Sequence, residues 1–154
     1  MLMIDEEKRH DIRYHVQYVF LPELVESVSE GYLPGIALFP SPQWYYNLRQ
    51  EYDLDELNAA GVYEDFERID VDDDHMLILY TFPQPQDTLE AVYGAVMLNT
   101  LTNEAEYYTL ELSCDDHWVL GQKTTSGHSS FGFWDVADKD KFIAWVIERA
   151  GKKK

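Results

Sequence analysis

The spacing of apolar side chains changes near Val62 and divides the chain into two halves. Before this point apolar residues recur every three or four positions, as on one face of a helix. This spacing predicts helices over about residues 5–20, 22–31 and 44–52 and a short fourth helix over 53–60. We expect Pro22 to end the first helix and Gly61 to end the last, because proline lacks an N–H and glycine favours helix C-termini.

After Val62, shorter apolar runs separated by turn-forming residues predict strands. They lie at 66–71, 76–82, 92–100, 106–113 and 117–123, and the alternation is clearest in 106–113. The links between them are short, so four or five strands connected in series, an antiparallel meander, are expected. Asp138 is positioned to cap a final helix whose apolar stripe ends at Gly151.

Helices and strands are segregated along the chain rather than alternating, which favours the α+β class over a parallel α/β fold. We therefore expect N-terminal helices, a four- or five-stranded antiparallel meander, and a C-terminal helix packed on the sheet. The segment 76–82 is apolar at both odd and even positions, which indicates a central strand covered on both faces. The pattern leaves open whether the two groups of helices cover the same face. The 154 residues fit a single domain, 1–154.

Composition favours a soluble cytoplasmic protein. Cys114 is the single cysteine and cannot form an internal disulfide. The N-terminus lacks the basic and apolar regions of a signal peptide, and no apolar run approaches the roughly 20 residues that span a bilayer. Aromatic residues form 14% of the chain, which argues against intrinsic disorder.

The strongest bias in the sequence is negative charge. The chain has a formal net charge of −17. Between Glu51 and Asp74, eleven of twenty-four residues are acidic and one, Arg68, is basic, so this segment contributes −10. Such a field repels nucleic acids and anionic membranes and attracts basic partners. We therefore expect no nucleic-acid or membrane binding.

Two motifs resemble functional sites but lack required parts. Gly127–Gly132 resembles a nucleophile elbow, but its second glycine comes one residue late and no histidine follows His128. We therefore interpret residues 124–130 as a surface loop entering a short strand. Asp70, Asp72 and Asp74 are spaced like the first ligands of a calcium loop. The required glycine and glutamate are absent further along, so an acidic hairpin tip is the better interpretation, with weak cation binding as the alternative.

The residues Cys114, His117 and His128 include metal-ligand types but lack a paired spacing. The sequence therefore predicts no metal site, no cofactor and no catalytic residue. Cys114 instead continues the buried face of the strand 106–113.

A dense group of aromatic residues adjoins the acidic segment. Carboxylates around aromatic rings bind cationic groups, so this region is the candidate partner-binding surface. The candidate residues are Trp44, Tyr45, Tyr52, Asp53, Asp55, Glu56, Asp70, Asp72, Asp73 and Asp74. The alternative is that the rings only pack a helix on the sheet, since apolar stripes at helical spacing are usually core.

Two functions remain open at this point. The first is a small acidic protein-binding module that neutralises or docks onto a basic protein, as immunity proteins and inhibitors do. The second is a small-molecule-binding or enzymatic domain with a pocket between the sheet and the aromatic helices. The sequence leaves the partner's identity and the oligomeric state open.

Overall fold

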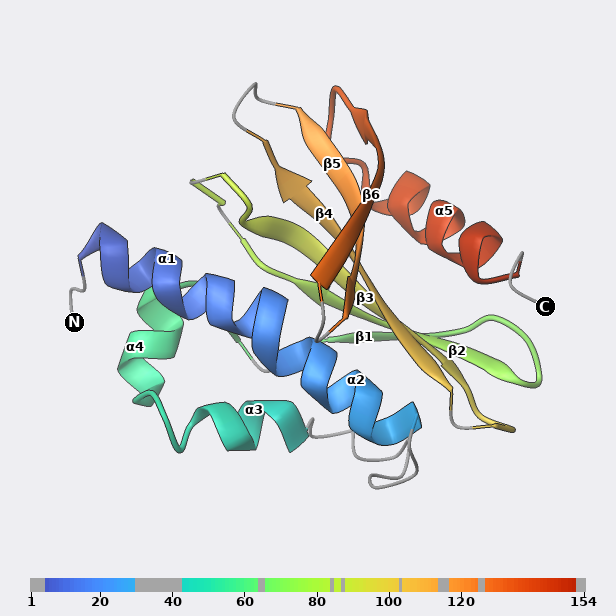
Figure 1. Ribbon diagram of the computed structural model, residues 1–154, viewed down its shortest axis with the longest axis horizontal. Helices are drawn as coiled ribbons and strands as arrows, with labels where there is room; N and C mark the ends of the chain where they lie inside the picture. Colours follow the sequence, from blue (N-terminus) through green and yellow to red (C-terminus); the bar gives the residue numbers. More distant parts are fainter. Residues whose placement is uncertain are drawn as a thin grey trace.

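The computed structural model describes residues 5–29, 43–63, 66–83, 85–86, 88–102, 104–113, 117–124 and 127–151. Its helical elements are α1 (Glu6–His15), η1 (Val16–Phe20), α2 (Leu21–Ser29), α3 (Gln43–Leu48), α4 (Leu54–Ala59) and α5 (Lys139–Gly151). Its strands are β1 (Glu67–Asp70), β2 (His75–Thr81), β3 (Ala91–Asn99), β4 (Ala105–Leu112), β5 (Trp118–Thr124) and β6 (Gly127–Trp134). The N-terminal helices lie on one side of the twisted sheet and α5 on the other (Figure 1). The α+β prediction is confirmed, with six strands instead of four or five.

The first helical layer is one continuous rod in which α1, η1 and α2 follow without a break. The prediction that Pro22 ends the first helix is wrong. In a regular helix the proline ring would clash with a carbonyl one turn earlier. Here the preceding turn is a π-helix, in which the Leu21 N–H donates to the carbonyl of Val16, five residues back. This wider turn lets the rod continue through Pro22.

The sheet is a simple antiparallel meander in the order β1-β2-β3-β4-β5-β6. The five predicted strands agree closely with β1 to β5, but the loop predicted over residues 124–130 includes the first half of β6. Gly127 pairs with Thr124 and Trp134 with Trp118, so the whole segment belongs to the sheet. The register shifts between Leu120 and Gly121, a β-bulge that leaves the apolar alternation of β6 too irregular to indicate a strand.

Strand β2 separates two hydrophobic cores. Met76, Ile78 and Tyr80 pack under the N-terminal helices, whereas Leu77 and Leu79 pack toward α5. All five side chains are buried, as the apolar pattern at both parities predicts. The question that the sequence leaves open is thereby answered, because the two groups of helices cover opposite faces of the sheet.

Helix α5 begins as predicted, with Asp138 accepting a hydrogen bond from the Lys141 N–H at 3.0 Å. Phe142 and Val146 are fully buried against the sheet. The ring of Trp145 meets Tyr108 of β4 edge-on at 5.6 Å. In the described part of the chain, no helix combines the length and apolar character needed to cross a membrane.

Gly94 in β3 makes room for a tyrosine ring on the face covered by the N-terminal helices. A Cβ at this position would lie 2.7 Å from the hydroxyl oxygen of Tyr107 and 3.1 Å from Cε2 of Phe82. Both neighbours are buried, so neither ring has space to move. At Gly121 the closest atoms to such a Cβ, the Ser129 carbonyl oxygen and Thr109 Oγ1, lie 3.3 Å away.

We expect Gly94→Ala to lower the free energy of unfolding by about 1–3 kcal/mol, the usual cost of overpacking a core. Gly121→Ala is the matched control, since it also adds one methyl group to a strand glycine, and it should cost less. Urea denaturation of both variants measures the difference. Equal losses would show that the Tyr107 ring moves aside freely.

Candidate functional site

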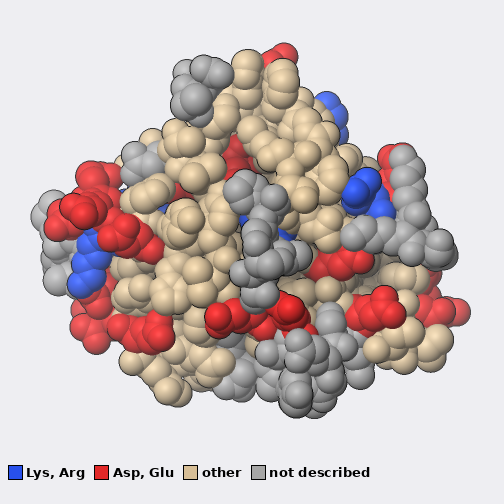
Figure 2. All heavy atoms as spheres, in the orientation of Figure 1, with Lys and Arg blue, Asp and Glu red and all other residues tan. Residues whose placement is uncertain are grey.

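One end of the molecule gathers carboxylates from two helices. Helices α1 and α4 lie against each other, and Lys8 of α1 forms an ion pair with Glu56 of α4. We call the surface around this contact the helical acidic surface, and its carboxylates are Asp5, Glu7, Asp11, Glu51, Asp53, Asp55 and Glu56. Figure 2 shows acidic side chains gathered over the end of the molecule where α1 and α4 meet in Figure 1.

Tyr52 lies among three of these carboxylates. Its hydroxyl is 3.0 Å from Nδ1 of His15, and the two rings meet edge-on. Burial first, then the charges of Glu51, Asp11 and Glu56, raise the pKa of Tyr52. Three carboxylates from different elements therefore act on the same hydroxyl, so they form one negative region rather than scattered charges.

Two of the predicted residues also have a structural role. Asp53 is the N-cap residue of α4, and its backbone N–H donates to Glu56 Oε1 at 3.1 Å. The hydrogen bond from Lys8 first, and then this backbone bond, lower the pKa of Glu56. Asp53 and Asp55 remain exposed to solvent, so the cap leaves negative charge accessible at the surface.

The second acidic group is the turn between β1 and β2. Asp72 accepts hydrogen bonds from the Asp74 N–H at 2.8 Å and from Nδ1 of His75 at 2.9 Å, and these bonds lower its pKa, that from His75 most. Asp73 is exposed. Asp70 lies beside Arg68, at 3.3 Å from its Nε. The turn rests on the β3–β4 turn, where the Thr100 N–H donates to the Asp74 carbonyl.

The two acidic groups lie at opposite ends of the molecule, because β1 and β2 carry the hairpin turn away from α4 (Figure 1). The candidate residues therefore fall into two groups: Tyr52, Asp53, Asp55 and Glu56 at one end, and Asp70, Asp72, Asp73 and Asp74 at the other. The acidic segment is continuous in the sequence, but in the structure its two parts are far apart.

The aromatic residues near α4 differ in exposure. Tyr45 is 4% exposed and belongs to the core beneath the helices, so it packs as the alternative interpretation expects. Tyr46 and Tyr63 are 47% and 41% exposed. Trp44 lies in α3, but its side chain is outside the described residues.

A buried charge cluster joins α1 to the sheet. Glu90, just before β3, accepts two hydrogen bonds from Arg9, at 2.8 and 2.9 Å. Nε of Arg13 lies 3.1 Å from the same carboxylate, and Nδ1 of His10 also lies at 3.1 Å. Burial raises the pKa of Glu90, but the hydrogen bonds outweigh it and the pKa is lowered overall. We call Arg9, Arg13 and Glu90 the arginine clamp.

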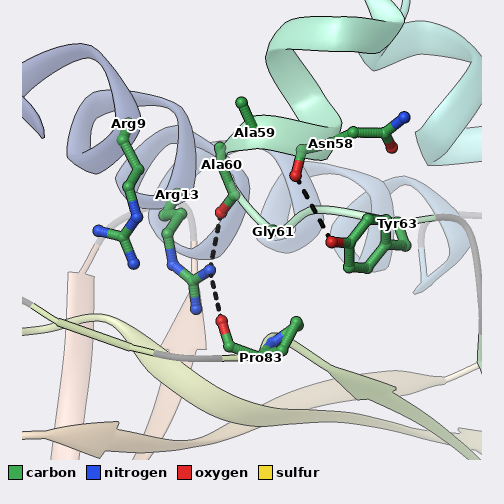
Figure 3. Close-up of a pocket in the computed structure, with 8 residues that line it drawn as sticks. All are labelled: Arg9, Arg13, Asn58, Ala59, Ala60, Gly61, Tyr63 and Pro83. Carbon is green, nitrogen blue, oxygen red and sulfur yellow. Dashed lines mark hydrogen bonds between the residues drawn. The ribbon is translucent and has the colours of Figure 1, made fainter. Parts of the chain in front are cut away.

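Arg13 uses its remaining donors on the backbone. Its Nη atoms donate to the carbonyls of Ala60, Pro83, Phe82 and Ala91, at 2.8 to 3.2 Å. The pocket between α1, α4 and Pro83, about 160 Å³ in volume, therefore has carbonyl-bound Arg13 along its wall (Figure 3). Burial lowers the pKa of Arg13 to about 10, although Glu90 raises it. This arrangement serves to hold elements together, because backbone carbonyls engage both Nη atoms of Arg13 and its Nε lies in the buried ion pair with Glu90.

The clamp is not evident in the sequence, because charged residues are normally exposed. One signal was present: Arg9 and Arg13 are four residues apart and Arg13 directly follows Ile12, which places both beside the apolar stripe of α1. Glu90 carries no comparable signal, because its position depends on long-range packing.

A second buried pair lies beneath η1. Nζ of Lys123 is 2.6 Å from Oε2 of Glu111, and the two residues are 3% and 4% exposed. Glu111 also accepts hydrogen bonds from the hydroxyls of Tyr18 and Thr109. Burial lowers the pKa of Lys123 against the attraction of Glu111. A lysine of this kind can serve in catalysis, but here solvent and substrate do not reach it.

No three histidine, cysteine or acidic side chains among the described residues are placed to hold a metal ion. Cys114 and the side chain of His128 lie outside the described residues. His117 is described and lies 3.7 Å from Asp135.

Comparison of the chain with protein-family models, with curated proteins and with solved structures gives no significant match.

We expect Glu90→Gln to lower the free energy of unfolding by about 3–5 kcal/mol at neutral pH, because it leaves two buried guanidinium groups without their carboxylate. The pKa of Glu90 in the folded protein lies below its ordinary value of 4.5. At a pH between these two pKa values, the unfolded chain therefore binds more protons than the folded protein. The stability that Glu90 supplies is therefore complete above pH 4.5 and is lost as the pH falls through the folded pKa. The difference in free energy of unfolding between the wild type and Glu90→Gln should therefore become smaller as the pH falls below 4.5, as measured by denaturation curves at each pH.

We expect Lys123→Met to cost about 3–5 kcal/mol, because it leaves the Glu111 carboxylate buried without a countercharge. Adding Glu111→Gln removes that charge while keeping an acceptor for Tyr18, so the double variant should be more stable than the single one. Thermal unfolding of both variants provides the test. A double variant less stable than Lys123→Met would contradict the role of charge balance.

Proposed function

We propose that this protein is a small acidic binding module that docks onto a basic protein and neutralises it, in the manner of immunity proteins and inhibitors. The observation that carries the proposal is the helical acidic surface, where seven carboxylates stand on or directly before α1 and α4, and Glu56 of α4 pairs with Lys8 of α1. A field of this density accelerates association with a positively charged surface and orients the partner.

The helical acidic surface supports this role better than the hairpin turn. Its carboxylates stand on or beside two packed helices, which hold them in fixed positions. Leu54 begins α4, and the Tyr63 hydroxyl donates to the Asn58 carbonyl of the same helix; their side chains are 43% and 41% exposed, so they can add apolar contact area to the charges. At the hairpin turn, Asp72 is already engaged by the Asp74 N–H and by His75.

The enzymatic alternative has less support. Lys123 and Glu111 are the pair with the most catalytic character, and both are almost fully buried. The pocket beside the arginine clamp is bordered by Arg13, and both of its Nη atoms are already engaged by backbone carbonyls.

The proposal is tested by neutralising equal charge at the two ends. One variant carries Glu7→Gln, Asp11→Asn and Asp55→Asn, and the matched control carries Asp72→Asn, Asp73→Asn and Asp74→Asn. Partners captured from cell lysate at about 0.05 M and about 0.5 M salt are identified by mass, and the Kd of the purified complex is then measured for each variant. We expect a stoichiometric basic protein whose affinity falls at least about tenfold for the helical variant and much less for the control.

Two results would contradict this proposal. One is that no basic protein binds with fixed stoichiometry. The other is that both triple variants lose the same affinity, which would mean that only net charge matters and that no specific surface is used.

A further inference from the structure

The solvent-facing stripe of α1 and η1 changes from acidic to aromatic along its length. Glu7, Asp11, Tyr14 and Tyr18 are spaced by four, three and four residues, so they lie along one line of the helical rod. Tyr14 is 43% exposed, and its ring stacks on that of Tyr18 at 4.4 Å. The helical acidic surface therefore continues into a pair of stacked rings.

The aromatic surface extends from the rod onto the sheet. The Tyr18 hydroxyl donates to Glu111 at 2.7 Å. Glu111 is the register partner of Val119, and Val119 is the partner of Phe133. Side chains of directly opposed residues point to the same face of a sheet, so Phe133 lies on the same face as Glu111. Neighbouring strands are about 4.8 Å apart, which places Phe133, two strands away, about 10 Å from Glu111.

Phe133 ends this line as an exposed ring. It is 61% exposed and contacts the ring of His117 at a centroid distance of 4.7 Å. We call Tyr14, Tyr18, His117 and Phe133 the aromatic patch. Carboxylates lie at both of its ends, Asp11 on α1 and the exposed Asp135 beside His117. Figure 2 shows that the face above α1 in this view is largely uncharged.

We propose that the aromatic patch is the second half of the docking surface and receives arginine side chains of the basic partner on the exposed rings of Tyr14 and Phe133. This inference rests on the proposed function. The Tyr18 ring supports Tyr14 from below, since Nζ of Lys123 already lies 4.0 Å from its centroid. Exposed aromatic faces attract guanidinium groups, and carboxylates beside them can accept the guanidinium hydrogen bonds. Charge selects this occupant, because a second copy of a chain with net charge −17 or an anionic membrane would be repelled.

The aromatic patch would also contribute affinity for the partner at high salt, where the attraction by the carboxylates is screened. Carboxylates steer the partner from a distance, whereas stacked rings contribute only on contact. The two halves of the surface therefore have different salt dependences, which makes them separable by experiment.

The test uses eight-residue peptides of arginine, lysine or glutamate, titrated into the folded protein at about 0.05 M salt. Aromatic NMR signals of Tyr14 and Phe133 report contact with the rings. We expect saturable shifts with the arginine peptide, weaker shifts with the lysine peptide, because ammonium groups stack less well, and none with the glutamate peptide.

The variant Tyr14→Ala with Phe133→Ser removes two exposed rings and should fold. It should weaken arginine-peptide binding about five- to thirty-fold, as expected for two exposed cation–π contacts. Leu101→Ser, at a side chain that is 77% exposed beyond the patch, is the matched control and should bind normally.

The outcomes separate this inference from the proposed function. Normal peptide affinity of the double variant, together with a loss for Glu7→Gln with Asp11→Asn, would overturn the aromatic patch and leave the acidic surface intact. Absence of saturable binding by either cationic peptide would count against both. Equal affinity for arginine and lysine would also overturn the stacking role, since it would indicate charge alone.

Discussion

The arrangement of the helical layer depends on one buried ionic contact, the arginine clamp. Glu90 lies directly before β3, and its carboxylate contacts Arg9 and Arg13 of α1. Through its other nitrogen atoms Arg13 reaches the chain after α4 and the end of β2. One side chain thus links α1, α4 and the sheet, and the orientation of the helical acidic surface follows from it. Removing one charged partner lowers the free energy of unfolding by far more than the whole cluster contributes to it, because the remaining charges stay buried without a countercharge.

Local patterns predicted most of the fold. Five strands follow from apolar runs and turns, and α5 follows from the Asp138 cap and its apolar stripe. The errors occur where a local rule is overridden by its neighbours. Pro22 normally ends a helix, but a π-turn before it removes the clash. Strand β6 contains glycines and a bulge, and only its pairing with β5 shows that the strand begins at Gly127 rather than after Ser130.

The candidate site was less predictable than the fold, because it depends on which segments meet in space. The acidic residues are evident in the sequence, yet their division between α4 and the β1–β2 turn depends on the direction in which β1 leaves the helices. The contribution of α1 to the helical acidic surface arises from its contact with α4, over forty residues later. The buried state of Tyr45 likewise reflects the packing of α3, which helical spacing alone does not distinguish from exposure.

The π-turn η1 also has a consequence for how the sequence can change over evolution. A π-turn holds one more residue than an α-turn, so it behaves as a single-residue insertion that the rod absorbs locally. In a regular α-helix, by contrast, one added residue would rotate every following residue by about 100° around the helix axis. The apolar face of α2 is therefore in phase with the sheet only while the turn is kept. A homologue with one residue fewer at this point would need a compensating change in α2, so length here should vary less than in ordinary helices.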